Sequence, residues 1–414
     1  MDILDVLMGA KALSSRKSDP YGTIQKCCDY LYLASYNSLD YAYAKAFFDS
    51  GNVEVPTGAC SSVCKGRYYG RNFDWSYDNC AEFIVHVDAH DGRYASHGIA
   101  GGVKELTESF VSSGAKSEKY RLLPFILQDG QNEFGLVCST NVVPMDYGRN
   151  VSVPMGEQED SICGTMLVRY ILDHFKTAQE AFEYISQHVS VWFAKSLEEQ
   201  GYEQHYMLKD ATGVYCLEFV ENSAVLFDIS SHPYLTNFYM YGLNPNSDGT
   251  VYTPYTQDEE HNAVDTNGIT ANGCGLERWN MIVNAYESLT DKASVETLMQ
   301  SLRYTNAYTE TNAADVWYTE FVGIDNLTSN TSASEYSDIL SRARNKFAER
   351  SRNDLYPVWH TVHSVIYDIL AHTMYVKVQE GNDEYDSELS PYATKEYVTS
   401  MISDAVSRIL TGGS

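Results

Sequence analysis

A cysteine and an arginine lie on the two arms of a predicted β-hairpin within residues 58–75. Lys65-Gly66 has the residue types of a two-residue hairpin turn, with glycine able to take a positive φ. Counting outward from that turn predicts that Cys60 faces Arg71, with Cβ atoms about 4.5–5.5 Å apart. A guanidinium this close lowers the pKa of a thiol and favours the nucleophilic thiolate. The spacing therefore predicts a reactive cysteine.

An alternative interpretation gives these residues no catalytic role. Cys60 would then be a half-buried strand cysteine, Arg71 a surface ion-pair partner and Asp74 a turn residue. The chain has nine cysteines without the regular spacing of a disulfide framework. We expect most of them to be small buried hydrophobic residues in a reducing compartment.

Hairpins separated by helical blocks must position these residues. Apolar periodicity predicts hairpins at 61–72, 206–219 and 358–378, further strands at 82–87, 94–99 and 134–141, and helices at 161–175, 177–188, 276–288, 294–302, 335–349 and 393–410. This order indicates antiparallel sheets covered by helices. Apolar residues recurring at three- and four-residue steps from Tyr21 to Phe48 predict a helical segment before the hairpins.

Composition excludes several classes of protein. The chain of 414 residues carries 29 Lys and Arg against 56 Asp and Glu, a net charge of −27, so a nucleic-acid partner and docking on anionic lipid are both disfavoured. No apolar run approaches the roughly 18 residues of a membrane span. The first residues lack the basic region of a signal peptide. We expect a cytoplasmic protein, or an exported one if a signal peptide has been removed from a longer precursor.

A family resemblance covers about residues 58–380. Cys60-Ser61-Ser62, followed by Gly70 to Trp75, resembles the start of the choloylglycine hydrolase family, which contains bile salt hydrolases and penicillin V acylases. Residues 132–144, 235–237 and 277–279 resemble the later blocks of that family, in its order. Two features depart from it, because the first hairpin is short and 59 residues precede the cysteine.

The resemblance implies an α+β fold, a four-layer αββα sandwich of two antiparallel sheets covered by helices, as in N-terminal-nucleophile hydrolases. It also implies that Cys60 becomes the first residue of the mature chain. The helical pre-segment 1–59 would be removed by autoproteolysis, leaving 60–414 as a single amidohydrolase domain. The new α-amine, with a pKa of about 7.7–8.0, would then serve as the base.

The family's site residues carry over to six positions, beginning with Cys60 as nucleophile. Arg71 would stabilise the thiolate, and Asp74 would orient the α-amine. Strand alternation puts Asp74 on the opposite face from Arg71, so its role needs a bulge or a strand end. The side chain of Asn237 and the backbone N–H of Asn141 would form an oxyanion hole. Arg278 would hold the polar network around the amine; the alternative is turn residues for both asparagines and a solvated helix residue for the arginine.

The predicted function is hydrolysis of a linear amide with an apolar acyl group, through a thioester on Cys60. Neither a cofactor nor a metal is expected, because His86/His90 and His360/His363 lack zinc-site spacing. The resemblance allows a homo-oligomer. Two alternatives remain, an acyltransferase of the penicillin-biosynthetic type and a non-catalytic protein with an intact Ala59–Cys60 bond. Loops such as 98–117 and 244–272 would decide the substrate, which the sequence does not reveal.

Overall fold

The computed structural model describes most of the chain between residues 19 and 378. The described ranges are 19–28, 31–50, 60–76, 81–101, 106, 108–115, 117–144, 160–193, 202–220, 223–240, 276–302, 305–307 and 358–378, with short strand pieces between 256 and 274. The helices expected at 335–349 and 393–410 lie outside these residues. None of the described helices is long and apolar enough to span a membrane.

The larger sheet has nine strands. In spatial order these are β1 (Thr23–Cys28), β2 (Leu31–Tyr36), β5 (Glu82–Val87), β6 (Ser96–Ala100), β7 (Leu127–Asn132), β8 (Val137–Pro144), β11 (Tyr202–Lys209), β12 (Val214–Val220) and β13 (Ser223–Asp228). Neighbours are antiparallel except β2 and β5, which run parallel. The expectation of a purely antiparallel sheet is wrong at this pair, because β2 reaches β5 through α2 (Tyr41–Asp49) and the β3–β4 hairpin rather than through a tight turn.

The second sheet has six strands and carries the cysteine hairpin. Its order is β14 (Tyr234–Leu235), β3 (Cys60–Lys65), β4 (Tyr68–Ser76), β21 (Val358–Asp368) and β20 (Thr305–Ala307), with β22 (Thr373–Val378) also on β21. The remaining strands are the pair β9 (Asp160–Cys163) and β10 (Val189–Trp192), the pair β15 (Asn237–Phe238) and β19 (Gly273–Cys274), and the short strands β16 (Thr256–Gln257), β17 (Ala263–Val264) and β18 (Thr270–Ala271).

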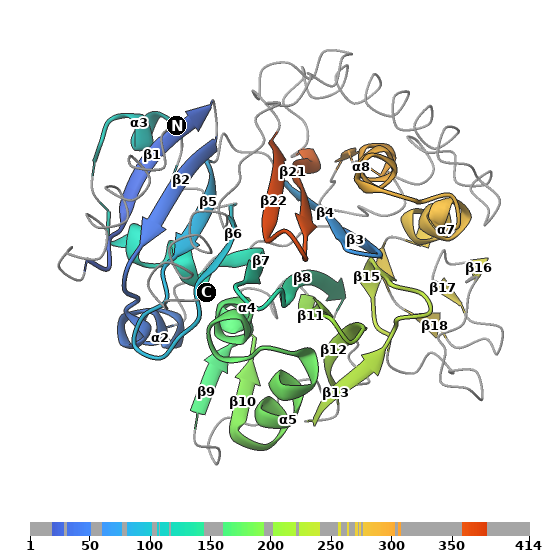
Figure 1. The fold of residues 1–414 in the computed structure, drawn as a ribbon, viewed down its shortest axis with the longest axis horizontal. Coiled ribbons are helices and arrows are strands. Elements are labelled where there is room, and N and C mark those ends of the chain that lie inside the picture. The colour runs from blue at the N-terminus through green and yellow to red at the C-terminus, as the bar shows by residue number, and fades with distance from the viewer. Residues whose placement is uncertain are drawn as a thin grey trace, which may run out of the picture.

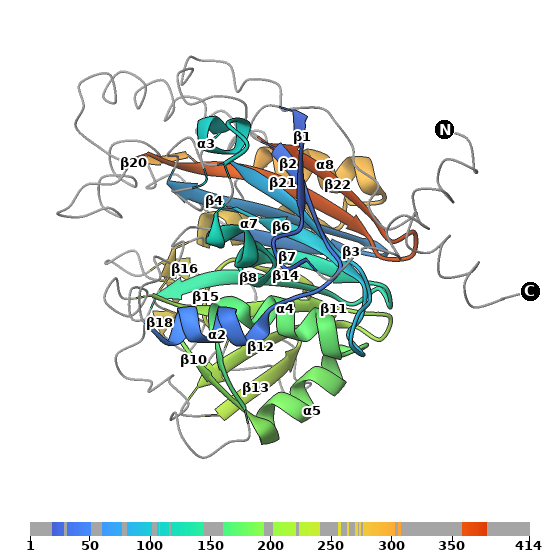
Figure 2. The ribbon, with the colours of Figure 1, turned by 90° about the vertical axis from the view of Figure 1, so that its left-hand side faces the viewer.

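Helices cover the outer face of each sheet. The helices α4 (Gly164–His174) and α5 (Ala178–His188) contact the nine-stranded sheet, while α7 (Leu276–Tyr286) and α8 (Lys292–Ser301) contact the six-stranded one (Figures 1 and 2). One hydrophobic cluster lies between the sheets and beneath α7 and α8, and a second lies between the nine-stranded sheet and α4 and α5. The order of layers is therefore helix, sheet, sheet, helix, which confirms the predicted α+β four-layer class.

The N-terminal segment differs from its predicted form. Residues 23–28 and 31–36 form the antiparallel strands β1 and β2 rather than a helix, and the helical prediction holds only for α2. The apolar positions of 31–36 also fit an alternating pattern, and the parallel pairing with β5 decides in favour of the strand. The described part of residues 1–59 is thus built into the edge of the larger sheet.

Strand β7 is polar and is not among the strands predicted from the sequence. Its residues Gln128, Asp129, Gln131 and Asn132 are all buried, as are both its neighbouring strands. A turn pattern and a buried polar strand have the same composition, and only tertiary partners distinguish them. The strand matters because Asp129 belongs to the site. Two short 3-10 turns, η1 (Glu118–Arg121) and η2 (Leu123–Phe125), lead into it.

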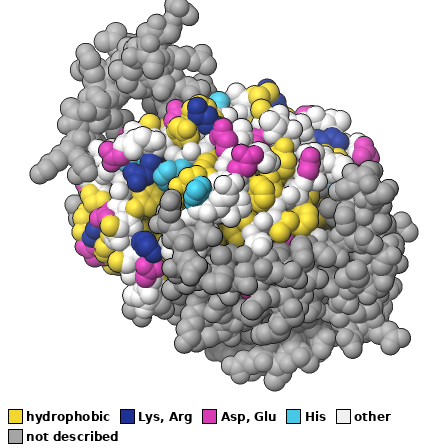
Figure 3. Space-filling model, turned by 90° about the horizontal axis from the view of Figure 1, so that it is seen from below, with side chains coloured by type: hydrophobic (Ala, Val, Ile, Leu, Met, Phe, Trp, Pro, Cys, Tyr) yellow, Lys and Arg dark blue, Asp and Glu magenta, His cyan; other side chains and the backbone are white. Residues whose placement is uncertain are grey.

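The described surface carries mixed charges. On the face shown in Figure 3, Lys and Arg side chains are scattered among acidic and hydrophobic ones and do not gather into a basic stripe. The described side chains on that face lack the concentrated positive charge with which proteins bind nucleic acid.

Candidate active site

The hairpin β3–β4 turns one residue later than its sequence predicts. The two-residue loop is Gly66-Arg67, with φ +60° at Gly66, and Cys60 pairs with Phe73. Arg71 faces Ser62. The predicted direct pairing of Cys60 with Arg71 is therefore wrong by two residues along β4. An even shift keeps a side chain on the same face of the sheet, so Arg71 still lies diagonally beside the cysteine.

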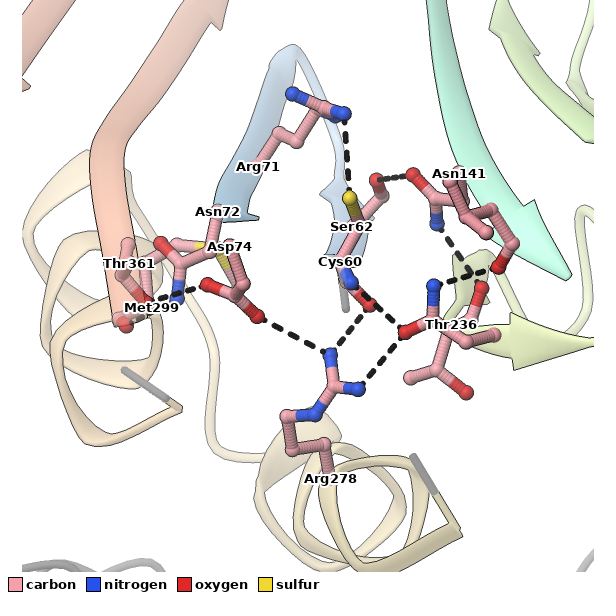
Figure 4. Close-up of polar contacts among 12 residues, drawn as sticks. Cys60, Ser62, Arg71, Asn72, Asp74, Asn141, Thr236, Arg278, Met299 and Thr361 are labelled. Atoms are coloured by element: carbon pink, nitrogen blue, oxygen red, sulfur yellow. Dashed lines mark hydrogen bonds and ion pairs between the residues drawn. The ribbon is translucent and has the colours of Figure 1, made fainter. Parts of the chain in front are cut away.

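The Arg71 guanidinium reaches the sulfur from this diagonal position. Its Nη2 lies 3.4 Å from Cys60 Sγ (Figure 4). The same nitrogen donates to the Thr140 carbonyl at 2.6 Å. Burial raises the pKa of the Cys60 thiol, and the charge of Arg71 offsets only part of that shift. The expected lowering of the Cys60 pKa is thus wrong for the intact chain, since the hairpin pattern did not show that the cysteine is only 1% exposed.

The backbone of Cys60 is held by two other predicted site residues. Its N–H donates to Asn237 Oδ1 at 2.7 Å, and its carbonyl accepts from Arg278 Nη1 at 2.5 Å. Arg278 Nη2 donates to the same Asn237 oxygen at 2.8 Å. The three residues come from β3, β15 and α7, so residues far apart in sequence meet at the backbone N–H and carbonyl of Cys60.

Asp74 lies on the opposite face of β4 from Arg71, as strand alternation predicts. Its Oδ2 is 3.5 Å from Arg278 Nη1, and its Oδ1 accepts from the Thr361 hydroxyl at 2.5 Å. The irregularity that sequence reasoning required exists, but it lies in the partner strand: between Thr361 and His363 the register of β21 against β4 shifts. Asp74 therefore approaches the Cys60 backbone through Arg278.

Asn141 joins the two sheets beside the cysteine. Its Oδ1 accepts from the Ser62 hydroxyl at 3.4 Å, and its Nδ2 donates to the Thr236 carbonyl at 3.2 Å. Asn237 Nδ2 donates to the Val142 carbonyl at 2.6 Å, one residue along β8. Both asparagines thus lie at the site, while their use as oxyanion donors stays a prediction.

The structure adds site residues that the sequence analysis missed. Asp129 Oδ2 accepts from Arg71 Nη1 at 2.8 Å, and both side chains are fully buried. Burial would raise the pKa of Asp129, but the hydrogen bond from His363 and the charge of Arg71 leave it lowered. Thr361 and Ser62 are further additions. No local pattern could have found Asp129, because its polar strand lacks the apolar alternation by which strands are predicted.

Glycine at position 70 lets the helix layer approach this hairpin. A Cβ there would come within 2.8 Å of Val295 Cγ1 and 3.1 Å of Met299 Cγ on α8. The neighbouring Asn72 donates to the Met299 carbonyl at 2.8 Å. The Gly-Arg-Asn sequence therefore combines a contact with α8 on one face of β4 and a contact with Cys60 on the other.

Three residues on β11 and β12 could hold a metal ion. The ligand atoms of His205, Cys216 and Glu218 all lie within 4.8 Å of one another. His205 Nδ1 is 3.0 Å from Glu218 Oε1, which also accepts from the Met240 N–H at 2.7 Å. His205 Nε2 is 2.9 Å from the Thr236 carbonyl. These contacts satisfy the trio by hydrogen bonding and brace the segment that carries Asn237, so we assign it no ion.

Three groups converging on one cysteine suit acyl chemistry. Arg71 is placed to favour negative charge on sulfur, Asn237 holds the N–H of the peptide bond that precedes the nucleophile, and Arg278 holds the carbonyl of the peptide bond that follows it. In the intact chain the Cys60 nitrogen belongs to an amide, so it has no free amine to act as base. The geometry is consistent with a precursor whose cysteine acts after its amine is released.

Comparison with known proteins finds a family model that matches part of the chain. The family model for acyl-coenzyme A:6-aminopenicillanic acid acyl-transferase matches residues 62–267, a range that contains Arg71, Asp74, Asn141 and Asn237. No curated protein matches the chain. Among solved structures, a mutant conjugated bile acid hydrolase from Clostridium perfringens is 15% identical, with 82% of this chain and 97% of that chain covered and a TM-score of 0.37.

A penicillin V acylase from Agrobacterium tumefaciens is 13% identical, with 77% of this chain and 82% of that chain covered and a TM-score of 0.34. The family match rests on sequence. The matched range includes strand β4, which carries Arg71, and both candidate asparagines. Over residues 62–267, just under half of its length, this chain is therefore similar to the acyl-coenzyme A:6-aminopenicillanic acid acyl-transferase family, which is related to the choloylglycine hydrolases.

Proposed function

We propose that the protein is a self-processing N-terminal-cysteine amidohydrolase that cleaves a linear amide C–N bond. The observation that carries this proposal is the set of contacts on Cys60: Arg71 at its sulfur, Asn237 at its nitrogen and Arg278 at its carbonyl oxygen. A structural cysteine needs no such arrangement, whereas a nucleophile inside a peptide bond that must be broken does.

Processing would begin with attack of the Cys60 sulfur on the Ala59 carbonyl carbon. The S–C bond forms, the C–N bond breaks, and the thiol proton passes to the released amine. Water then hydrolyses the thioester and frees residues 1–59 as a carboxylate. The new amine, held near Asn237 and the Arg278–Asp74 pair, becomes the base for later cycles.

Turnover would use the same sulfur on a substrate amide. Attack gives a tetrahedral intermediate whose oxyanion needs donors, for which Asn237 and the backbone N–H of Asn141 are the candidates. The amine leaves with a proton from the α-amine, and water hydrolyses the acyl-thioester. Bile salts, penicillin V and other N-acyl compounds with an apolar acyl group are the substrates to screen.

Acyl transfer is the second candidate, because the matching family model is that of an acyl-transferase. A transferase would pass the acyl group from Cys60 to an amine rather than to water. The nucleophile and its contacts would be the same in both reactions, and the difference would lie in what reaches the thioester.

The intact mass of freshly purified protein tests the proposal, with Cys60→Ala as control. A new species matching residues 60–414, absent from the control, is the expected result. A panel of amides with and without an added primary amine then separates hydrolysis from transfer by the product formed. Full-length protein in both preparations, with no alkylation of Cys60, would instead indicate a non-catalytic protein with its Ala59–Cys60 bond intact.

A further inference from the structure

A row of buried ionisable side chains extends from Cys60 into the core. Behind the Arg71–Asp129 pair, His363 Nε2 lies 3.3 Å from Asp129 Oδ2. The other ring nitrogen, Nδ1, lies 2.8 Å from Glu82 Oε2. Every side chain in the row is at most 1% exposed. The row crosses from β4 through β7 and β21 to β5, so it links both sheets.

The contacts determine the charge of His363. An ionised carboxylate accepts hydrogen bonds and cannot donate them, and a neutral imidazole has only one N–H. With a carboxylate oxygen at each ring nitrogen, both nitrogens donate only when His363 is an imidazolium. Burial lowers the pKa of His363, but the hydrogen bonds from its ring to Asp129 and Glu82 outweigh that effect and leave the pKa raised.

The charges of the row then cancel. Arg71 and His363 contribute two positive charges, and Asp129 and Glu82 contribute two negative ones. Without the proton on His363, two buried carboxylates would share one guanidinium. Such an excess charge is costly in the interior and would draw Arg71 away from sulfur toward the acids.

The other groups around His363 cannot replace its charge. The Phe73 ring stacks on the imidazole at a centroid distance of 5.1 Å. The Tyr367 hydroxyl donates to Asp129 Oδ1 at 2.5 Å, and burial raises the pKa of Tyr367 well above its usual value. Both side chains are neutral, so His363 is the balancing cation among the described neighbours of Asp129 other than Arg71.

We propose that His363 is a positioning residue whose positive charge, balanced by Glu82, frees the Arg71 guanidinium to act on the Cys60 sulfur. This inference rests on the proposed function, since it assigns a role toward the nucleophile. It gives the pair Glu82 and His363, which never touch Cys60, control over how readily the thiolate forms.

The test is a charge-balance cycle of three variants, His363→Gln, Glu82→Gln and the double variant. The readout is the rate of Cys60 alkylation by iodoacetamide in processed protein, followed between pH 6 and 9 by peptide mass spectrometry. We expect His363→Gln to raise the Cys60 pKa and to slow alkylation at pH 7 about tenfold, the effect of one pKa unit. The double variant restores neutrality and should return to within about twofold of wild type, because one acid then faces one guanidinium.

Other outcomes would overturn the proposal, and one rescue outcome would support it. A double variant as slow as His363→Gln, or an unchanged rate in His363→Gln, overturns the charge assignment. If His363→Gln does not fold, a folded and reactive double variant still supports the proposal, and an unfolded one overturns it. The assay needs no amide substrate, so failure of the amidohydrolase proposal would appear separately, as wild-type protein with a reactive Cys60 and no turnover.

Discussion

At the scale of single residues, the site is defined by which atom of Cys60 each neighbour contacts. Arg71 acts on sulfur, Asn237 on nitrogen and Arg278 on the carbonyl oxygen. Burial opposes the thiolate and Arg71 favours it, and in the intact chain burial has the larger effect on the pKa of Cys60. Any change in the local charge should therefore show directly in thiol reactivity.

Arg71→Leu should both destabilise the fold and raise the Cys60 pKa further. Removing the guanidinium leaves Asp129 buried next to one cation instead of two, and breaking a buried pair costs about 3–5 kcal/mol. Urea unfolding and Cys60 alkylation measure the two effects. Arg71→Lys keeps the charge but loses the forked set of N–H donors, and it serves as the control. It should lose less unfolding free energy and less thiol reactivity than Arg71→Leu. Equal thiol reactivity in wild type and Arg71→Leu would contradict the role given to Arg71.

Asn237→Ala should slow both self-cleavage and amide turnover, by about 10²–10³-fold if Asn237 supplies an oxyanion donor. The matched control is Asn72→Ala, which removes another buried asparagine whose contacts are with the Met299 carbonyl and Ser364. The control should lower the unfolding free energy without a comparable loss of rate. Similar rates for the two variants would show that Asn237 only stabilises the fold.

At the scale of elements, the register of the β3–β4 hairpin decides which residue of β4 lies opposite Cys60. Alternation along β4 places Arg71 toward the sheet interface and Asp74 toward α7 in both the predicted and the observed register, because the two registers differ by an even number of residues. The turn position decided between Arg71 and Phe73 as the direct partner, and the left-handed backbone at Gly66 set it. Strand alternation thus predicted which face of β4 each side chain occupies, and the turn position decided which residue lies opposite Cys60.

Gly70→Ala should push α8 from the six-stranded sheet. The new Cβ would meet Val295 at 2.8 Å, and overpacking of this kind typically costs about 1–3 kcal/mol. The unfolding midpoint in urea measures the loss. Adding Val295→Ala removes the clashing methyl and should recover part of the stability. A double variant that loses more stability than the two single variants together would argue against this packing account.

At the scale of the whole molecule, the segment before Cys60 is part of the core. Tyr32, Ala34 and Tyr36 of β2 and Phe48 of α2 are at most 2% exposed. Strand β2 pairs with β5 over six residues, and the Tyr36 hydroxyl donates to the Tyr120 carbonyl at 2.6 Å. A cut at Ala59–Cys60 would break one covalent bond and none of these contacts.

We therefore expect the 1–59 fragment to remain bound after processing. Native mass spectrometry should show both pieces together, and denaturing conditions should separate them. Tyr36→Ala leaves a cavity and should release the fragment, since such a loss costs about 3–5 kcal/mol. Tyr36→Phe loses only one hydrogen bond, worth about 1 kcal/mol, and should retain it. A wild-type fragment that dissociates in native buffer would refute this view.

Local patterns and a family resemblance in the sequence determined much of the site. Hairpin and helix periodicity predicted β3, β4, α4, α5, α7 and α8, because these features depend on neighbours a few residues apart. The family resemblance selected residues that the structure brings together: Arg71, Asp74, Asn141, Asn237 and Arg278.

The tertiary structure alone decided what depends on distant partners. It set the register of Cys60, the direction in which its pKa shifts, the strand form of residues 23–28 and 31–36, and the pairing of Arg71 with Asp129 and of His363 with Glu82. Burial and charge at one atom are sums over residues from many elements, and the order of residues along the chain does not specify those sums until the two sheets have packed.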